Sequence, residues 1–368
     1  MQTLDYQEQI IFSLRSLYDR YGYLPYKMNK FEEYDLYARN KDFLISDSII
    51  TFTDLGGKLM ALKPDVTLSI VKNTAGSPRA LQKLYYNENV YRVSKNAHAF
   101  REIMQVGLEC LGSIDDYCIC EVLLLAAKSL QTITADCVLD ISHLGLMSEL
   151  LAAVGLPKET LSEAFQAVSQ KNLHELETLC LKNGVCPEHI CLLQQLLQLR
   201  GNLHQALPQL RSLLSGFSTL PSLARFDRIL SALACEDVAD VLRIDFSVVD
   251  DVHYYNGVVF KGFLSGVPSS VLSGGQYDKL MKKMHRSCGA IGFAVYTDLL
   301  ERLDGSSRTY DVDTVLLYPQ DAPLSAVTAK VRELTGQGIS VLAVSRLPED
   351  LRYRQLIRLE VTSLANHP

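Results

Sequence analysis

One long helical stretch separates two parts of the chain that are rich in strand patterns. From about residue 148 to 239, Leu and Ala dominate, and Gly and Pro occur only at isolated positions. Strand patterns, with runs of Val, Ile, Leu and Tyr, precede and follow this stretch. They occur at 81–93, 103–111 and 137–141, and again at 241–249, 256–264, 270–273 and 290–295. The sequence therefore predicts a helical insertion between two β-rich halves.

Further elements follow from local signals. Apolar residues on one stripe predict a helix over 5–21, and Gly56-Gly57 predicts a hairpin between strands 48–53 and 58–62. Pro64 opens a helix that runs to about residue 73, and a longer helix is expected over 119–131. After a linker at 304–307, the pattern predicts a small βαβα unit with elements at 314–318, 325–334, 339–344 and 349–359.

Composition bounds the class of protein. The 368-residue chain is 48% hydrophobic, enough to bury a core without disulfides or metals. Its 36 basic and 42 acidic side chains give a net charge of −6, so no attraction to nucleic acid is built in. No apolar run reaches membrane-spanning length, and the N-terminus lacks a signal-peptide pattern. Nine scattered cysteines then indicate reduced thiols in a cytoplasmic protein that does not engage a membrane.

One group of residues in the helical stretch has the chemistry of metal ligands. It consists of Cys180, Cys186, His189 and Cys191. Their spacings match no compact zinc pattern, so we interpret them as small core residues. We expect neither a metal nor a cofactor.

Asp65 and Thr67 stand where a strand pattern gives way to a helix. A carboxylate and a hydroxyl at such a corner can hold a ligand ammonium group or an imidazole N–H. The alternative is that one of the two side chains simply caps the helix, which the local pattern alone favours.

A second group of polar residues lies on neighbouring predicted strands. Gln105, Gly107 and Glu109 alternate, so their side chains share one face, and Arg92 can point toward the same face. A zwitterionic amino acid needs such a mixture, because a carboxylate receives its ammonium and a guanidinium or amide its carboxylate. The alternative is a buried Arg–Glu pair that only fixes the sheet.

Two further segments combine aromatic residues with glycine. Tyr254 and Tyr255 are adjacent on a predicted strand, so one can line a pocket while the other packs. Gly274 and Gly275 allow close approach of a ligand, and we expect them to turn the chain into a helix from Tyr277. No phosphate-binding loop, dinucleotide fingerprint or nucleophile triad occurs in the sequence. The acidic run that typically binds phosphoribosyl pyrophosphate is also missing.

Taken together and in this order, these segments resemble those of histidine–tRNA ligases and of their paralogues, the regulatory subunits of ATP phosphoribosyltransferase. The resemblance covers about residues 5–303. The matching segments are 31–36, 62–67, Arg92 with 101–109, 254–257, 273–278 and 289–294.

The resemblance implies an α+β fold, with a class II aminoacyl-tRNA synthetase-like antiparallel sheet flanked by helices. A helical insertion and a small α/β C-terminal piece complete it. The expected domains are 1–145 and 241–305 for the two parts of the core, 146–240 for the insertion, and 311–368 for a truncated α/β domain.

The resemblance also implies a histidine pocket. Two carboxylates and a hydroxyl would face the ligand ammonium, an amide would meet its carboxylate, and tyrosines would flank the imidazole. Arg92 matches the arginine that contacts the activated carboxyl–phosphate region in the ligases. The other implied residues are Asp65, Glu109 and Thr67 for the ammonium, Gln105 for the carboxylate, and Tyr254 or Tyr255, with Tyr277, for the ring.

Departures from the ligase pattern lie on the nucleotide side. Asp250 and Leu299 occupy positions where ligases carry arginines that grip ATP phosphates, and Tyr296 replaces a glycine that makes room for adenine. Losing two such cations should remove the chemical step, because phosphoryl chemistry depends on charge stabilisation. Lys63 in place of arginine is a milder change.

The C-terminal piece adds to this expectation. Only 58 of the 368 residues follow Tyr310, which is short for the anticodon-binding domain of a ligase. Arg352, Arg354 and Arg358 fall on the last predicted helix, where we interpret them as a solvated face or a partner contact.

The resemblance thus implies a regulatory subunit with no catalysis of its own. It would activate the short-form catalytic subunit of ATP phosphoribosyltransferase in the first step of histidine synthesis, and carry feedback inhibition by L-histidine. A homodimer through the class II core within a hetero-oligomer is implied as well. Two alternatives stay open: an active histidine–tRNA ligase, and a degenerate scaffold without a ligand.

Overall fold

The computed structural model describes residues 5–41, 44, 49–74, 81–93, 99–249, 254–302 and 310–360. The chain divides into two compact units. One lies within Gln7–Leu303, and the other within Asp304–Pro368 together with Met1–Tyr6.

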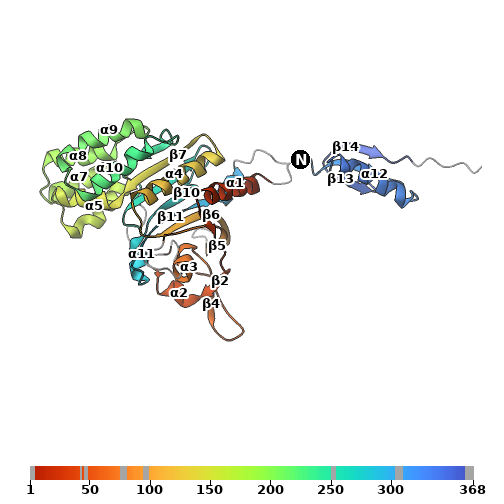
Figure 1. Cartoon of the computed structure of the whole chain (residues 1–368), viewed down its shortest axis with the longest axis horizontal. Helices are drawn as coiled ribbons and strands as arrows, with labels where there is room; N and C mark the ends of the chain where they lie inside the picture. Colours follow the sequence, from red (N-terminus) through yellow and green to blue (C-terminus); the bar gives the residue numbers. More distant parts are fainter. Residues whose placement is uncertain are drawn as a thin grey trace, which may run out of the picture. The chain divides into compact units, whose positions relative to one another are not determined.

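An eight-stranded sheet forms the centre of the larger unit (Figure 1). All neighbouring strands are antiparallel except at the two edges, where β1 pairs with β5 and β7 with β8 in parallel. This confirms the expected antiparallel sheet of a class II synthetase-like core. In spatial order the strands are β1 (Leu24–Pro25), β5 (Gln82–Val93), β6 (Phe100–Gly112), β11 (Gly289–Tyr296), β10 (Leu272–Gln276), β9 (Val258–Leu264), β7 (Cys137–His143) and β8 (Leu242–Ile244).

Helices α1 (Tyr6–Arg20) and α4 (Asp116–Ile133) pack on one face of the sheet. The buried Tyr18 of α1 joins them, because its hydroxyl lies 2.9 Å from that of Ser129 and its ring meets Phe293 edge-on at 5.9 Å. Asp115 caps α4 by accepting a backbone N–H of the first turn at 2.8 Å. This face is therefore closed by aliphatic and aromatic packing.

The predicted helical insertion lies between β7 and β8 (Figure 1). Asn172 caps one of its helices, and Asn202 and Gln205 form a capping box at another. The last helix packs on α4 and so ties the insertion to the core. Its helices are α5 (Leu144–Ala153), α6 (Leu161–Ser169), α7 (Leu173–Lys182), α8 (Pro187–Leu197), α9 (Leu203–Leu213) and α10 (Pro221–Leu233), with short 3-10 turns at Lys158–Thr160 and Ser215–Phe217.

A small three-stranded sheet precedes the first long strands of the core. It has the order β2 (Phe31–Glu33), β4 (Leu59–Leu62), β3 (Thr51–Thr53), with α2 (Tyr34–Ala38) beside it. The predicted hairpin is present, and Asp54 fixes its turn by accepting the N–H groups of Gly56 and Lys58. Strand β4 leads within five residues into α3 (Thr67–Asn73).

The predicted turn at Gly274 and Gly275 is wrong. Both glycines lie inside β10, and α11 (Asp278–Lys283) begins after the strand. The glycines serve close packing instead, because a Cβ on Gly274 would lie 2.4 Å from the carbonyl oxygen of Gly292. A Cβ on Gly275 would lie 2.7 Å from the ring of Tyr255.

The smaller unit is a parallel three-stranded sheet with one helix in its described part. Strands β12 (Val312–Leu317), β13 (Val341–Val344) and β14 (Tyr353–Arg358) have the order β13-β12-β14, and α12 (Leu324–Gly336) contacts β13.

The predicted last helix over 349–359 is wrong, because β14 occupies this segment. Leu356 and Ile357 are adjacent, so they point to opposite faces, and only Ile357 joins the core cluster of Leu316. The three arginines therefore share no helix; Arg352 pairs with Asp311 at 2.8 Å.

Candidate binding pocket

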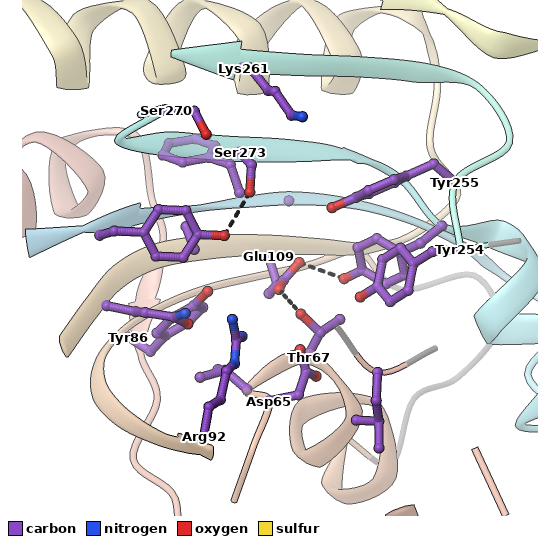
Figure 2. Close-up of a pocket in the computed structure, with 18 residues that line it drawn as sticks. Asp65, Thr67, Tyr86, Arg92, Glu109, Tyr254, Tyr255, Lys261, Ser270 and Ser273 are labelled. Atoms are coloured by element: carbon purple, nitrogen blue, oxygen red, sulfur yellow. Dashed lines mark hydrogen bonds between the residues drawn. The ribbon is translucent and has the colours of Figure 1, made fainter. Parts of the chain in front are cut away.

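A cavity of about 380 Å³ opens over the sheet face opposite α1 and α4 (Figure 2). A volume of this order is typical of small-molecule sites. All eight residues predicted for the site line the cavity. They come from the β4–α3 corner, from the long strands β5 and β6, and from the segment around β9 and β10. These residues are Asp65, Thr67, Arg92, Gln105, Glu109, Tyr254, Tyr255 and Tyr277.

Small residues form the floor of this cavity. Strands β6 and β11 place Glu109 opposite Gly292 and Gly107 opposite Ala294. A Cβ on Gly292 would lie 1.8 Å from Oε2 of Glu109, so only glycine leaves room for the carboxylate. A Cβ on Gly107 would lie 2.5 Å from the Tyr86 hydroxyl. Glycine at these two positions therefore leaves room for the Glu109 carboxylate and the Tyr86 hydroxyl.

Glu109 is the central ionisable group of the cavity. Its carboxylate accepts hydrogen bonds from the Thr67 hydroxyl at 2.7 Å and from the Tyr277 hydroxyl at 2.5 Å. Burial raises the pKa of Glu109 to about 8, although both hydrogen bonds oppose that shift. The empty cavity thus holds an acid that a cationic ligand would ionise.

Asp65 performs both of the roles that the sequence left open. It lines the cavity, and its Oδ1 accepts the N–H of Leu68 in the first turn of α3 at 2.8 Å. Burial raises the pKa of Asp65, while this hydrogen bond and the charge of Arg92 lower it. A second buried carboxyl group therefore stands beside Glu109.

Contacts with β5 hold the corner that carries Asp65. Arg92 Nε donates to the carbonyl of Pro64 at 3.1 Å, and the buried Lys63 pairs with Glu88. Glu88 in turn accepts the backbone N–H of Met28 at 3.3 Å. Lys63 does not line the cavity, so it supports the corner from behind.

Three tyrosines form one wall. The rings of Tyr254 and Tyr255 meet edge-on at 4.6 Å, and Tyr254 lies 5.8 Å from Tyr277. Burial raises the pKa of Tyr254 and Tyr277 well above the ordinary value, so both phenols are neutral. Neutral phenols against an acidic floor suit a polar ring or a cation.

The cavity also has lining residues that the sequence reasoning did not assign to it. Tyr86 lies on the same face of β5 as Arg92, so strand alternation could have found it. Tyr296 was noted only as a departure from a family pattern. No comparable signal marks the others, which include Lys261, Ser270 and Ser273.

By the sequence resemblance, Leu299 and Asp250 occupy positions where the ligases carry arginines. Leu299 is half-buried in the 3-10 turn Thr297–Arg302 and does not line the cavity. Asp250 lies outside the described residues. Tyr296 does line the cavity, and its hydroxyl lies 2.8 Å from that of Ser273.

Metal chemistry finds no support in the described part of the chain, where His, Cys, Asp and Glu residues nowhere gather in the numbers that a metal ion requires. Cys180 is buried as predicted, but the prediction that Cys186 and Cys191 are core residues is wrong, because both are exposed. Among the same residues, no helix is long and apolar enough to cross a membrane. The arrangement instead suits a small ligand that carries a cationic and an anionic group.

Comparison with known proteins gives a consistent picture. The family model described as histidyl-tRNA synthetase matches residues 2–300. A protein of Desulforamulus reducens, named ATP phosphoribosyltransferase regulatory subunit, is 28% identical over 335 residues, which is 89% of this chain and 82% of that protein.

Solved structures share the fold. A Bacillus halodurans structure, described as an ATP phosphoribosyltransferase regulatory subunit/histidyl-tRNA synthetase, has a TM-score of 0.80 at 24% identity. It covers 97% of this chain and 96% of that one. A chain of the ATP phosphoribosyl transferase (HisG:HisZ) complex from Thermotoga maritima has a TM-score of 0.61 at 21% identity, covering 80% and 98%.

Proposed function

The chain belongs to the histidyl-tRNA synthetase family, and on that premise we propose that it is a regulatory subunit of ATP phosphoribosyltransferase. In this role it activates a short-form catalytic subunit and carries feedback inhibition by L-histidine in the first step of histidine synthesis. Curated relatives that match most of this chain have that name.

One observation carries the ligand assignment: a single cavity holds both the acceptors and the donors that an amino acid needs. Glu109, Asp65 and Thr67 offer acceptors for an ammonium group. Arg92 and Gln105 supply donors for a carboxylate. The tyrosine wall of residues 254, 255 and 277 then flanks the imidazole.

Chemistry on ATP has less support in the same cavity. Tyr296 and Ser273, which line it, are hydrogen-bonded to each other, and Leu299 offers no charge for a phosphate. The chain therefore binds histidine without activating it.

The proposed assembly contains the catalytic subunit and a homodimer through the class II core. A net charge of −6 gives no attraction to nucleic acid, which fits a protein partner better than tRNA. A cytoplasmic location follows from the proposed pathway. Feedback requires histidine to bind two states of the complex with different affinity.

Co-expression with the candidate catalytic subunit tests the proposal. Phosphoribosyl transfer to ATP should rise when this chain is present and fall when histidine is added. Glu109→Gln should weaken inhibition and leave the complex intact, since it removes a buried charge that faces the ligand. Glu102→Gln is the matched control, because Glu102 lies exposed on the same strand.

Two results would contradict the proposal. Histidine-dependent exchange of pyrophosphate into ATP by the purified chain would establish a ligase. Failure of histidine to bind either the chain or the complex would favour a scaffold without a ligand.

A further inference from the structure

Two hydroxyl groups that line the binding cavity form a hydrogen bond with each other. Tyr296 of β11 and Ser273 of β10 lie on adjacent strands, and their oxygens are 2.8 Å apart. Both side chains are half-buried and line the cavity. In Figure 2, Ser273 lies between Glu109 on one side and Lys261 and Ser270 on the other.

The neighbouring floor positions give this contact its importance. Gly292, Ala294 and Tyr296 share one face of β11, and Tyr296 has the one large side chain of these three. The hydrogen bond to Ser273 fixes that ring, whereas a free tyrosine side chain would change rotamer. The cavity therefore has a wall at this point.

The register of the sheet, combined with the proposed orientation of the amino acid, indicates which end of a ligand would meet Tyr296. Tyr296 pairs with Gln105 on β6, and Glu109 lies four residues further along that strand. An amino acid whose ammonium faces Glu109 and whose carboxylate faces Gln105 thus directs its carboxyl group at Tyr296. Any extension from the carboxyl group would meet the phenol ring.

We propose that the Tyr296–Ser273 bridge makes the cavity selective for a free amino acid over derivatives that are extended through the carboxyl group, such as amides, esters and peptides. This inference rests on the proposed function, because it uses the amino-acid orientation given there. Lys261 and Ser270 line the same cavity beyond the bridge, so the bridge narrows the cavity between them and the amino-acid end. Its loss would widen this passage.

Calorimetry with two ligands tests the wall. L-histidine and the dipeptide histidyl-glycine share the ammonium and the imidazole, and the dipeptide adds about 3.6 Å at the carboxyl end. Glycyl-histidine, extended at the amino end, is the control ligand. Affinities are measured for the chain alone and for its complex with the catalytic subunit.

The wild-type chain should bind histidine and discriminate against histidyl-glycine. Tyr296→Ala should reduce this discrimination about 10- to 100-fold, while glycyl-histidine stays excluded. Tyr296→Phe and Ser273→Ala keep most of the wall and lose the hydrogen bond, so each should reduce it about three- to tenfold. Tyr117→Ala, at an exposed tyrosine outside the cavity, should leave the ratio unchanged.

Two outcomes overturn the proposal: wild-type affinities for histidine and histidyl-glycine within about threefold of each other, or an unchanged ratio in folded Tyr296→Ala and Ser273→Ala. If another free amino acid binds in place of histidine, the proposed function fails, and that amino acid with its glycyl extension tests the wall. If no free amino acid binds, both proposals fall.

Discussion

The affinity for histidine should depend on pH through Glu109. Its pKa of about 8 in the empty cavity means that about nine in ten molecules carry the neutral acid at pH 7. An ammonium group beside Glu109 favours the carboxylate and lowers its pKa. Binding therefore releases a proton, and the affinity rises as the pH rises toward 8.

The expected size follows from this pKa. Ionising Glu109 costs about 1.4 kcal/mol at pH 7 and about 2.7 kcal/mol at pH 6, so affinity should rise roughly tenfold per pH unit over this range. Above about pH 8 the gain should level off, because the carboxylate is already ionised. At still higher pH the ligand loses its own positive charge and binding should weaken.

Calorimetry in buffers of different ionisation enthalpy measures the released proton directly. About 0.9 proton per bound histidine should leave the wild-type protein at pH 7. Glu109→Gln should lose this release and keep only the titration of the ligand itself, and Glu102→Gln should behave as wild type. A wild-type profile that is flat from pH 6 to 8, or proton release that persists in Glu109→Gln, would refute the argument.

Three further predictions concern packing and stability. Gly292→Ala should abolish histidine binding and lower the melting temperature, because its Cβ would lie 1.8 Å from the Glu109 carboxylate, whereas Gly216→Ala, with nothing within 4 Å, should do neither. His143 is buried, and burial lowers its pKa to about 4. The free energy of unfolding should therefore be highest above pH 6.5 and fall as the pH is lowered from 6.5 toward 4. Urea unfolding should show a loss of about 2 kcal/mol at pH 5, which His143→Asn should largely remove. Asp115→Ala should cost about 1 kcal/mol in the same assay, since it removes the cap of α4; an unchanged midpoint would contradict that role.

Strand alternation made most of the cavity predictable. Gln105 and Glu109 share a face because side chains alternate along β6, and Arg92 reaches the same face from β5. The insertion was equally clear, since a helical pattern of such length has no strand counterpart. Long segments contain enough repeats of the hydrophobic period to distinguish a helix from a strand.

Short segments and contacts between strands were harder to predict from the sequence. Leu356 and Ile357 fit a helix as well as a strand, and only pairing with β12 decides between them. Gly274 and Gly275 suggested a turn because their packing against β11 is invisible in one sequence. The bridge between Ser273 and Tyr296 depends on register, which local patterns do not specify.

The pairing of β6 with β11 has a consequence for synthesis of the protein. Gly112 at the end of β6 pairs with Gly289 at the start of β11, so residues 113–288 must be translated between the two. At about 5–20 residues per second this takes roughly 9 to 35 seconds. During that interval the nascent chain already has Glu109 but lacks the Gly292 floor and the Tyr296 wall. The binding pocket is therefore completed late on the ribosome, and a prematurely terminated chain would carry half a pocket and an open strand edge.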